Sequence, residues 1–337
     1  MLPLKTCRRY LWFVAIALAV TGCNRRGRVL EIAYVSTPQA TLRDRVATVF
    51  NKTGLVKNGD RVQILDRDRR FVQVRTDNGT EGWVEQRYLV SQQVYDGFQK
   101  LAQQEQSDPI QAAGTTRNDT NIHLEPGRET EHLYLLNTGN KVSILKRATA
   151  EKTLPGAAPK PSVDAGGQPA RTPAVLEDWW LIRDAQGHIG WVLARMVDLD
   201  VPLEIAQYAE GQRIVAYFVL DQVNDGDKKV PQYLVMLTEP KDGMEFDYNQ
   251  VRVFTWNVRK HRYETAYRER NLDGLLPVTV GQEDFDKEGT LPVFVLHVRD
   301  ESGNVSERKY KLNTPIVRRV LAPGEEPPRA VAKKKRR

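Results

Sequence analysis

Cysteine and histidine are the residues through which this chain could do nucleophilic or metal chemistry. A cysteine nucleophile needs a neighbouring base, and a zinc site needs clustered nitrogen, sulfur or carboxylate ligands. The 337 residues include only two cysteines, Cys7 and Cys23. The histidines are scattered without metal-ligand spacing, at His123, His132, His188, His261 and His297. A serine triad has no nucleophile-elbow signature to support it, although its members need not be adjacent. We expect no enzyme activity, no metal and no cofactor.

Tryptophans are candidates for ligand contacts instead. The stretch from Phe71 to Val84 reappears ungapped as Trp179 to Val192, and each copy ends in Gly-Trp-Val. We expect Trp83 and Trp191 of these endings to pack in the cores of small β modules, because one aromatic side chain can bury about 150 to 250 Å². The alternative is an aromatic surface that binds a peptide or a glycan.

The adjacent Trp179 and Trp180 are more informative about binding. Neighbours on a strand point to opposite faces, so if one is in the core the other is exposed or covered by the 28-residue inserted loop described below. The exposed member is the better candidate for a ligand contact. Tyr88, shortly after the first Gly-Trp-Val, is a further candidate.

A basic and aromatic hairpin lies nearer the C-terminus. Phe254-Thr255-Trp256-Asn257 turns through Arg259 towards Arg262 and Tyr263. Aromatic residues that alternate with arginine across a hairpin could form cation–π contacts, or a surface for an anionic glycan. Simple cross-strand packing is the alternative. Arg259, Arg262 and Tyr263 are therefore candidate binding residues.

The N-terminus predicts export. A positively charged start precedes ten apolar residues, Leu11 to Val20, which are too few for a membrane helix of about 20 residues and have the length of a signal-peptide core. Val20-Thr21-Gly22-Cys23 follows, and the segment resembles a bacterial lipoprotein signal. The resemblance implies cleavage after Gly22 and a lipid on Cys23. An ordinary cleaved signal or a short uncleaved anchor is the alternative.

This resemblance also implies a location. Residues 1–22 would be the signal and 23–32 a short tether that holds the first module near the membrane. Asn24 stands where the resembling family uses aspartate for inner-membrane retention. We therefore expect a cell-envelope protein with a lipid anchor, on the outer membrane and facing the periplasm.

The positive charge is concentrated at the C-terminus. Residues 318–337 carry a net +6 of the chain's +7, and the body from 23 to 317 is close to neutral. A proline-rich stretch followed by like charges cannot build a core, so we expect a disordered tail. Behind an export signal its partners would be anionic lipid or anionic wall polymer rather than nucleic acid. A solvated end with no specific partner is the alternative.

Short β segments surround each Gly-Trp-Val. Asn58 to Leu65 matches Thr138 to Leu145 at an offset of 80, whereas the Gly-Trp-Val blocks match at an offset of 108. The difference of 28 predicts an insertion, and the segment 148–176, rich in proline, alanine and glycine, is expected to be a flexible loop. The internal repeat indicates two copies of one unit.

This pattern resembles the bacterial SH3b domain, twice. The turn, the Val-x-Ile-Leu strand, the aromatic strand and Gly-Trp-Val carry the resemblance, over about 33–90 and 115–200. It implies two small β barrels, with peptidoglycan as the ligand; a protein partner in an envelope complex is the second possibility. A wall hydrolase is less favoured, because such enzymes often use a Cys-His pair and Cys23 is the only cysteine after the signal.

The remaining segments complete the predicted architecture. Val94, Phe98 and Leu101 recur at helical spacing, so 91–114 is expected to be a linking helix and linker that fixes how the barrels sit. No family is recognised in 203–317. Its seven short β segments favour an antiparallel sandwich or barrel. They are expected at 213–221, 232–238, 250–257, 262–268, 276–280, 291–300 and 305–312. The chain is predicted to be mainly β and to act in envelope binding or scaffolding.

Overall fold

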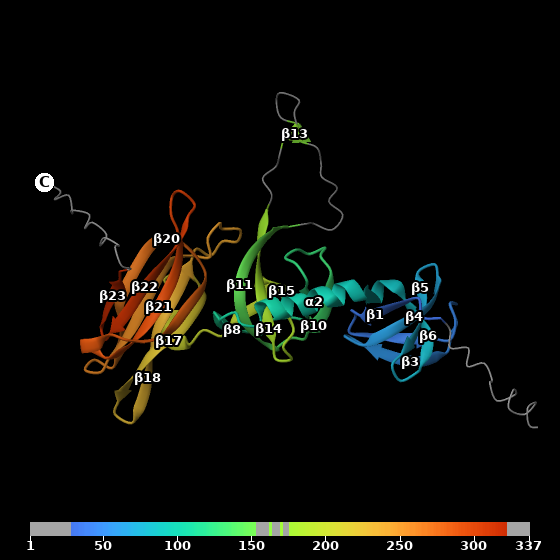
Figure 1. Ribbon diagram of the computed structural model, residues 1–337, viewed down its shortest axis with the longest axis horizontal. Coiled ribbons are helices and arrows are strands. Elements are labelled where there is room, and N and C mark those ends of the chain that lie inside the picture. Colours follow the sequence, from blue (N-terminus) through green and yellow to red (C-terminus); the bar gives the residue numbers. More distant parts are fainter. Residues whose placement is uncertain (1–27, 153–161, 164–168, 171–174, 322–337) are drawn as a thin grey trace, which may run out of the picture.

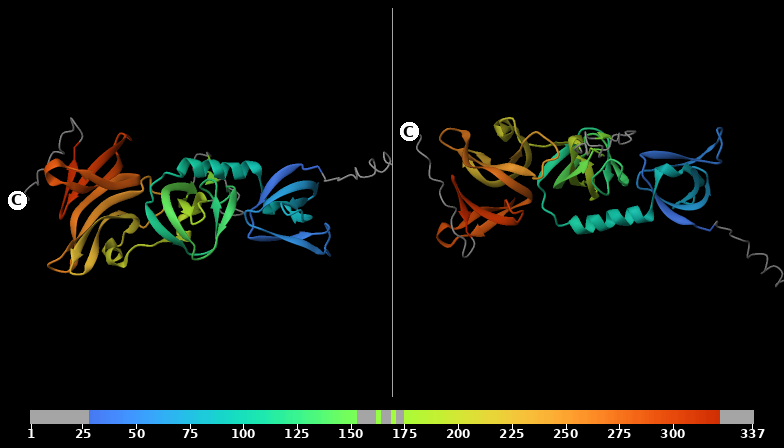
Figure 2. Two further views of the ribbon diagram at one scale, coloured as in Figure 1. Left: turned by 60° about the horizontal axis from the view of Figure 1, so that its bottom comes forward. Right: turned by 90° about the horizontal axis from the view of Figure 1, so that it is seen from above.

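Three antiparallel β domains lie in a row, and one helix runs alongside the middle domain (Figures 1 and 2). The computed structural model describes residues 28–152, 162–163, 169–170 and 175–321. No helix within these ranges is long and apolar enough to cross a membrane. The mainly β fold class is confirmed.

The first barrel is a seven-stranded sheet in the order β3-β2-β6-β5-β4-β1-β7. Alternate residues of its strands point inwards, and Val62, Ile64, Val72, Val74 and Val84 fill the core. Its strands are β1 (Glu31–Val35), β2 (Gln39–Arg43), β3 (Lys52–Lys57), β4 (Arg61–Asp68), β5 (Phe71–Thr76), β6 (Glu81–Glu85) and β7 (Leu89–Ser91), with the 3-10 turn η1 (Gln86–Tyr88) before β7.

The second barrel repeats the first strand by strand. Its order, β10-β9-β15-β14-β11-β8-β16, places each strand where the first barrel has its counterpart, so the sequence repeat is a repeat of structure. Its strands are β8 (Ala112–Thr116), β9 (Thr120–His123), β10 (His132–Leu136), β11 (Lys141–Glu151), β14 (Leu176–Asp184), β15 (Ile189–Leu193) and β16 (Val197–Leu199), with η2 (Ala194–Met196) before β16.

The predicted loop at 148–176 begins later than expected. β11 continues to Glu151, which pairs with Leu176 of β14, so residues 148–151 belong to the sheet. Between β11 and β14, β12 (Ser162–Val163) pairs with β13 (Pro169–Ala170). The other residues of the segment lie outside the described ranges.

Helix α2 (Gln92–Glu105) joins the two barrels. The Ser91 hydroxyl caps its start by accepting a hydrogen bond from the Val94 amide. Tyr95 stacks on Tyr34 of the first barrel with ring centroids 4.0 Å apart, and Phe98 meets Tyr134 of the second barrel edge-on at 5.4 Å. One helix face therefore contacts both barrels, as its apolar spacing predicted.

A direct contact between the barrels supplements the helix. The Asn58 side chain, in a turn of the first barrel, donates to the Leu133 carbonyl at 2.6 Å and accepts from the Leu135 amide at 3.2 Å. Because both backbone partners lie in β10, these bonds fix one barrel against an edge strand of the other.

The C-terminal domain is a meander of seven strands, each pairing with the next. Two predicted strands, 262–268 and 276–280, are parts of one long strand, and an unpredicted final strand places Arg318 opposite Lys311 in what was expected to be the tail. The elements are α3 (Leu203–Ala206), η3 (Gln207–Ala209), β17 (Arg213–Asp225), β18 (Lys228–Thr238), β19 (Tyr248–Asn257), β20 (Arg262–Asp284), η4 (Asp286–Glu288), β21 (Thr290–Arg299), β22 (Val305–Asn313) and β23 (Ile316–Val320).

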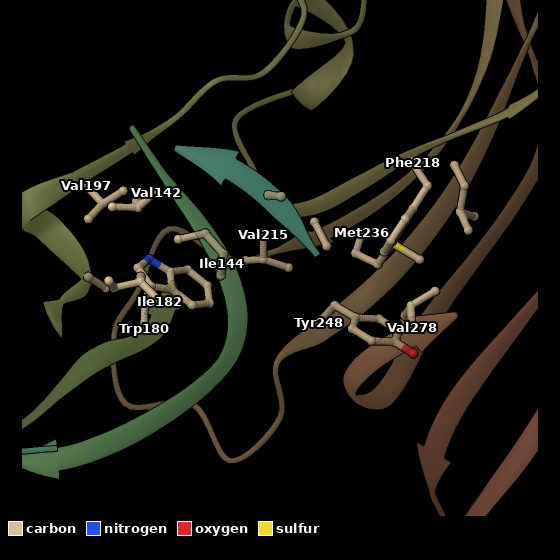
Figure 3. Close-up of a cluster of buried hydrophobic side chains, with 14 of the residues drawn as sticks. Val142, Ile144, Trp180, Ile182, Val197, Val215, Phe218, Met236, Tyr248 and Val278 are labelled. Carbon is tan, nitrogen blue, oxygen red and sulfur yellow. The ribbon is translucent and has the colours of Figure 1, made fainter. Parts of the chain in front are cut away.

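The core of the second barrel continues into the C-terminal domain. Trp180 and Ile144 of the barrel belong to the same buried cluster as Val215, Met236 and Tyr248 of the C-terminal sheet (Figure 3). A continuous apolar core resists separation, because pulling the two domains apart would expose it to water. The domain interface is therefore part of the fold.

Candidate ligand-binding site

The glycine of each Gly-Trp-Val is required by a close strand crossing. A Cβ on Gly82 would lie 2.7 Å from the Leu42 Cβ and 3.1 Å from the Arg43 carbonyl oxygen. A Cβ on Gly190 would lie 2.8 Å from the His123 carbonyl oxygen. No larger residue fits without moving backbone, so the motif closes each barrel.

The tryptophans of these motifs point outwards. Gly82 and Val84 are buried and Trp83 between them is half-buried, as alternation along a strand requires. Trp191 is also half-buried, and it packs in the same small cluster as Leu101 of α2. The expected core position of both tryptophans is therefore wrong: Trp191 anchors the linking helix, and Trp83 lies on the outer face of the first barrel.

The adjacent pair in the second barrel offers no exposed ring. Trp180 is 3% exposed and belongs to the shared core, and Trp179 is 2% exposed with its ring edge-on to His123 at 5.2 Å. The expectation that one member would present a binding surface is not met by the described residues.

A cleft of about 670 Å³ opens at one end of the first barrel. It lies between the β2–β3 loop and the β4–β5 turn, and arginine and phenylalanine form its walls. The Arg43 guanidinium sits 4.2 Å from the Phe50 ring centroid and 5.1 Å from that of Phe71. Arg69 and Arg70 line the facing wall and are exposed.

Asp44 holds the β2–β3 loop in shape. Its carboxylate accepts from the Asn51 amide at 2.8 Å and from the Arg45 guanidinium at 2.7 Å. Hydrogen bonds from Arg45 and Asn51 hold the pKa of Asp44 well below its usual range. This bracing presents Phe50 to the cleft.

A second depression of about 490 Å³ adjoins the cleft, and Arg70 lines both. Arg87 lies over the Tyr88 ring at 4.9 Å and pairs with Glu85 at 2.9 Å. Tyr88 is half-buried against the barrel core, so its ring serves mainly as a platform for Arg87. The two depressions together contain four arginines, Arg43, Arg69, Arg70 and Arg87, but only one carboxylate, Glu85. The surface therefore favours an anionic ligand.

The equivalent place on the second barrel is filled. The repeat puts His123, Trp179 and Asp178 where the first barrel has Arg43, Phe71 and Arg70. Burial lowers the pKa of His123 to about 4, with His132 beside it adding to the effect, so this side chain is neutral at pH 7. This counterpart is filled, and it has a neutral histidine and a carboxylate where the first barrel has two arginines, so it cannot bind an anion as the first barrel can.

Two sets of ion pairs close the second barrel at this end. Arg128, in the β9–β10 loop, donates to the Glu177 carboxylate at 2.6 and 2.5 Å, which ties the loop to β14 over Trp179. In the first barrel the equivalent residues are Thr48 and Arg69, which cannot form this pair.

Asp178 attaches the same end to the C-terminal domain. Its fully buried carboxylate accepts from Arg147 at 2.6 Å, from Arg213 at 2.7 Å and from the Gly243 amide at 2.9 Å. Burial disfavours its charge, but the bonds from Arg147 and Gly243 outweigh this and lower the pKa of Asp178. The second barrel therefore works as a structural joint.

The basic hairpin packs as ordinary cross-strand structure. Tyr263 is buried, its ring lies 5.0 Å from that of Trp256, and its hydroxyl donates to the Pro231 carbonyl. Arg262 pairs with Glu264, and no cation–π contact among the described residues involves Arg259 or Arg262. The hairpin presents exposed charge but no aromatic surface.

Two other predictions, the lipid on Cys23 and the disorder of the basic tail, fall mostly on residues outside the described ranges. Across 28–152 and 175–321, no three His, Cys, Asp or Glu side chains gather in a way that could hold a metal ion.

Sequence reasoning missed the cleft of the first barrel. Arg69-Arg70-Phe71 is visible in the sequence as two arginines directly before an aromatic strand residue. The cleft also needs Arg43 and Phe50 from an earlier part of the chain, and the sequence does not show that the β2–β3 loop folds against the β4–β5 turn.

Likeness to solved structures is weak. A crystal structure of an NlpC/P60 family protein from Bacillus cereus has 10% identity and a TM-score of 0.23, over 57% of this chain and 65% of that one, which is less than two thirds of its length. NlpC2 from Trichomonas vaginalis has 11% identity and a TM-score of 0.17, over 72% of this chain and 97% of that one. No curated protein sequence matches the chain.

The two barrels match two different family models. Residues 40–90 match the bacterial SH3 domain, as the resemblance in the first copy predicted. Residues 114–198 match the GW (Gly-Tryp) dipeptide domain, an SH3-like unit, rather than a second copy of the same family. The chain thus contains one bacterial SH3 domain and one GW dipeptide domain, and domains of both kinds are typical of cell-wall binding.

Proposed function

We propose that this chain is a lipid-anchored envelope protein that binds peptidoglycan through the arginine and phenylalanine cleft of its first barrel. The observation that carries the proposal is the contrast between the two repeat copies. The first copy keeps an open cleft with unneutralised positive charge, and the second fills the same place with Trp179 and the pair between Arg128 and Glu177.

The chemistry of the cleft suits the peptide part of the wall. Stem peptides carry carboxylates, and arginine recognises a carboxylate through two parallel N–H donors. Arg69 and Arg70 are exposed and can supply such donors, whereas Arg43 is held against the phenylalanine rings and shapes the wall between them. The rings of Phe50 and Phe71 offer apolar contact to the rest of the ligand.

The cleft has a fixed position relative to the second barrel and the C-terminal domain, because the three domains are joined rigidly. Helix α2 and Asn58 fix the first barrel to the second, and the shared core fixes the second barrel to the C-terminal domain. A lipid on Cys23 would place the cleft beside the membrane and the C-terminal domain farther away. The protein would then connect the membrane rigidly to the wall, without catalysing a reaction.

An acidic segment of an envelope protein is the second candidate ligand. The same excess of arginine over carboxylate favours it, because side chains of aspartate and glutamate present the same chemical group as stem peptides. An adaptor of this kind would bind its partner without binding purified wall.

Cosedimentation with purified sacculi tests the proposal. The variant Arg69→Ala/Arg70→Ala should bind at least tenfold more weakly, because hydrogen bonds to charged groups contribute about 1.5 to 3 kcal/mol each. Arg61→Ala is the matched control. It removes a partly exposed arginine at the first residue of β4. The arginine pair directly follows Asp68, the last residue of β4, which lies about 23 Å along the strand from Arg61. Binding of the parent protein should fall as salt rises.

Two outcomes would count against this function. Failure of the mature protein to pellet with sacculi at any salt concentration would reject wall binding and favour the adaptor. Release of soluble muropeptides on incubation would instead show a hydrolase. The anchor has its own test: Cys23→Ala should release the protein from membranes or leave it as precursor, and mature variant that still fractionates with membranes would refute lipidation.

A further inference from the structure

A depression of about 340 Å³, unrelated to the barrels, lies on the C-terminal domain. It opens where β18 ends and where β19 and β20 run side by side. Its volume is at the lower end of the range of about 300 to 1,000 Å³ that is usual for small-molecule sites. Its lining is almost wholly polar, with arginine, glutamate and side-chain amides.

The depression forms at an irregularity in the sheet. Tyr248 pairs with Gly274, but two residues later Gln250 pairs with Arg270, so the ladder between β19 and β20 is broken there. Asn271 in this break has the left-handed φ of 56°. The Tyr248 ring packs so closely on Gly274 that a Cβ there would lie 2.2 Å from it, which pins the irregular backbone. Bulges and left-handed residues of this kind cluster at functional sites.

The floor of the depression is built from buried polar groups. Arg252 is 1% exposed and donates to the Glu210 carboxylate and to the Tyr208 carbonyl, each at 2.7 Å. Its Nε has no hydrogen-bond partner among the described residues, and neither has the buried Oδ1 of Asn249. Unpaired buried polar atoms are costly, so this donor and acceptor make the layer beneath the depression energetically unfavourable, while the exposed charges above it are the groups that a ligand can reach.

The rim carries two charges of opposite sign that the protein does not neutralise. Arg270 donates through Nε to the Gln250 side chain at 2.9 Å, and its terminal nitrogens have no partner among the described residues. Glu239 forms no ion pair within the described ranges. Glu210, by contrast, is already held by Arg252 and Arg268.

We propose that this depression binds a small zwitterion, with a carboxylate held by Arg270 and an ammonium group held by Glu239. The formal charges of the lining cancel, because Arg252 and Arg270 balance Glu210 and Glu239, and this disfavours ligands that carry charge of only one sign. A free amino acid and the unlinked zwitterionic end of a wall peptide share this chemistry.

Calorimetric titration of the mature chain tests the inference. We expect D-alanine or meso-diaminopimelate to bind. N-acetyl-D-alanine, which lacks the ammonium group, and D-alaninamide, which lacks the carboxylate, should each bind at least tenfold more weakly than D-alanine. Tight binding of D-alanine indicates a free amino acid as ligand; binding of diaminopimelate alone indicates the end of a wall peptide.

Surface variants locate the site without disturbing the fold. Arg270→Gln and Glu239→Gln should each weaken binding at least tenfold, whereas Arg262→Gln, an exposed arginine on the same strand, should not. The cleft variant Arg69→Ala/Arg70→Ala should bind the zwitterion normally, so this inference and the wall-binding proposal fail separately. If D-alanine binds, equal binding of its two blocked forms would overturn the inference. No heat of binding for D-alanine or for diaminopimelate at millimolar concentration would overturn it as well.

Discussion

Asp178→Asn should destabilise the joint between the second barrel and the C-terminal domain. The substitution keeps the size of the side chain and removes its charge. Arg147, only 3% exposed at its side chain, would keep Asp247 at 3.1 Å, but its 2.6 Å partner would change from a charged carboxylate to a neutral amide oxygen. Arg213, which donates to the other carboxylate oxygen, would face the amide NH2 group and lose its bond. Breaking a buried ion pair from one side costs about 3 to 5 kcal/mol.

Urea unfolding followed by tryptophan fluorescence measures this cost, since Trp179 and Trp180 lie in the affected domain. With a slope of about 3 kcal/mol per molar urea, the midpoint should fall by about 1 to 1.7 M. Asp198→Asn is the matched control, because the pair between Arg117 and Asp198 is 57% and 56% exposed and such pairs contribute less than about 1 kcal/mol.

The acid side of the stability profile provides a second readout. Asp178 has a lowered pKa in the folded protein, so its charged form stabilises the fold above the ordinary aspartate pKa, and this contribution is lost as the pH falls through the folded value. Asp178→Asn should therefore lose less stability on acidification than the parent protein. If Asp178→Asn shifts the urea midpoint no more than Asp198→Asn does, the buried network does not join the domains.

Three further predictions concern the barrels. Gly190→Ala should cost about 2 kcal/mol or more in thermal unfolding, because its Cβ would lie 2.4 Å from Ile122 Cγ2; a stability loss below about 0.5 kcal/mol would show that the crossing has room. Trp191→Ala should cost about 2 kcal/mol, roughly half the value for a fully buried tryptophan, and should raise hydrogen exchange in α2; unchanged exchange would mean that the tryptophan does not anchor the helix. The unfolded chain binds a proton at His123 between pH 6.5 and about 4 while the folded chain does not, so stability should fall by about 2 kcal/mol across this window as the pH is lowered, after allowance for partial exposure. His123→Gln should remove that dependence, and a parent protein equally stable at both ends of the window would contradict the assignment.

The repeat made the architecture of the barrels predictable. Two offsets, with an insertion between them, located both units, and each strand of one has its counterpart in the other. The helical spacing of Val94, Phe98 and Leu101 likewise predicted a helix that packs on its neighbours. These features are local, because they depend on alternation and spacing within one short stretch.

The alternation of residues along a strand also predicts which way Trp83 points, but the expectation from the size of its side chain overrode it. With Gly82 against a crossing strand and Val84 in the core, Trp83 must point away from both. The preference for burying a large aromatic ring suggested the opposite. At Trp179 and Trp180 one exposed ring was expected, but both rings are buried because both faces of β14 are covered. The shared core covers one face, and His123 and its loop cover the other. Neither contact is visible in the sequence.

The candidate sites depend on contacts between distant segments. The cleft needs Arg43 and Phe50 to meet Phe71, and the polar depression needs a break in the ladder between β19 and β20. The long strand β20 was predicted as two because its middle is irregular in hydrophobic pattern, yet it runs through to Asp284.

Hydrogen–deuterium exchange with soluble wall fragments tests wall binding by the first barrel most directly, because it compares the two repeat copies within one molecule. We predict slower exchange in the first barrel at 44–51 and 69–71, where the loop and turn enclose the cleft. No change is expected at the equivalent segments of the second barrel, 124–131 and 177–179, which are already closed by Arg128 and Glu177. Protection confined to the second barrel, or protection of neither, would contradict this role of the cleft.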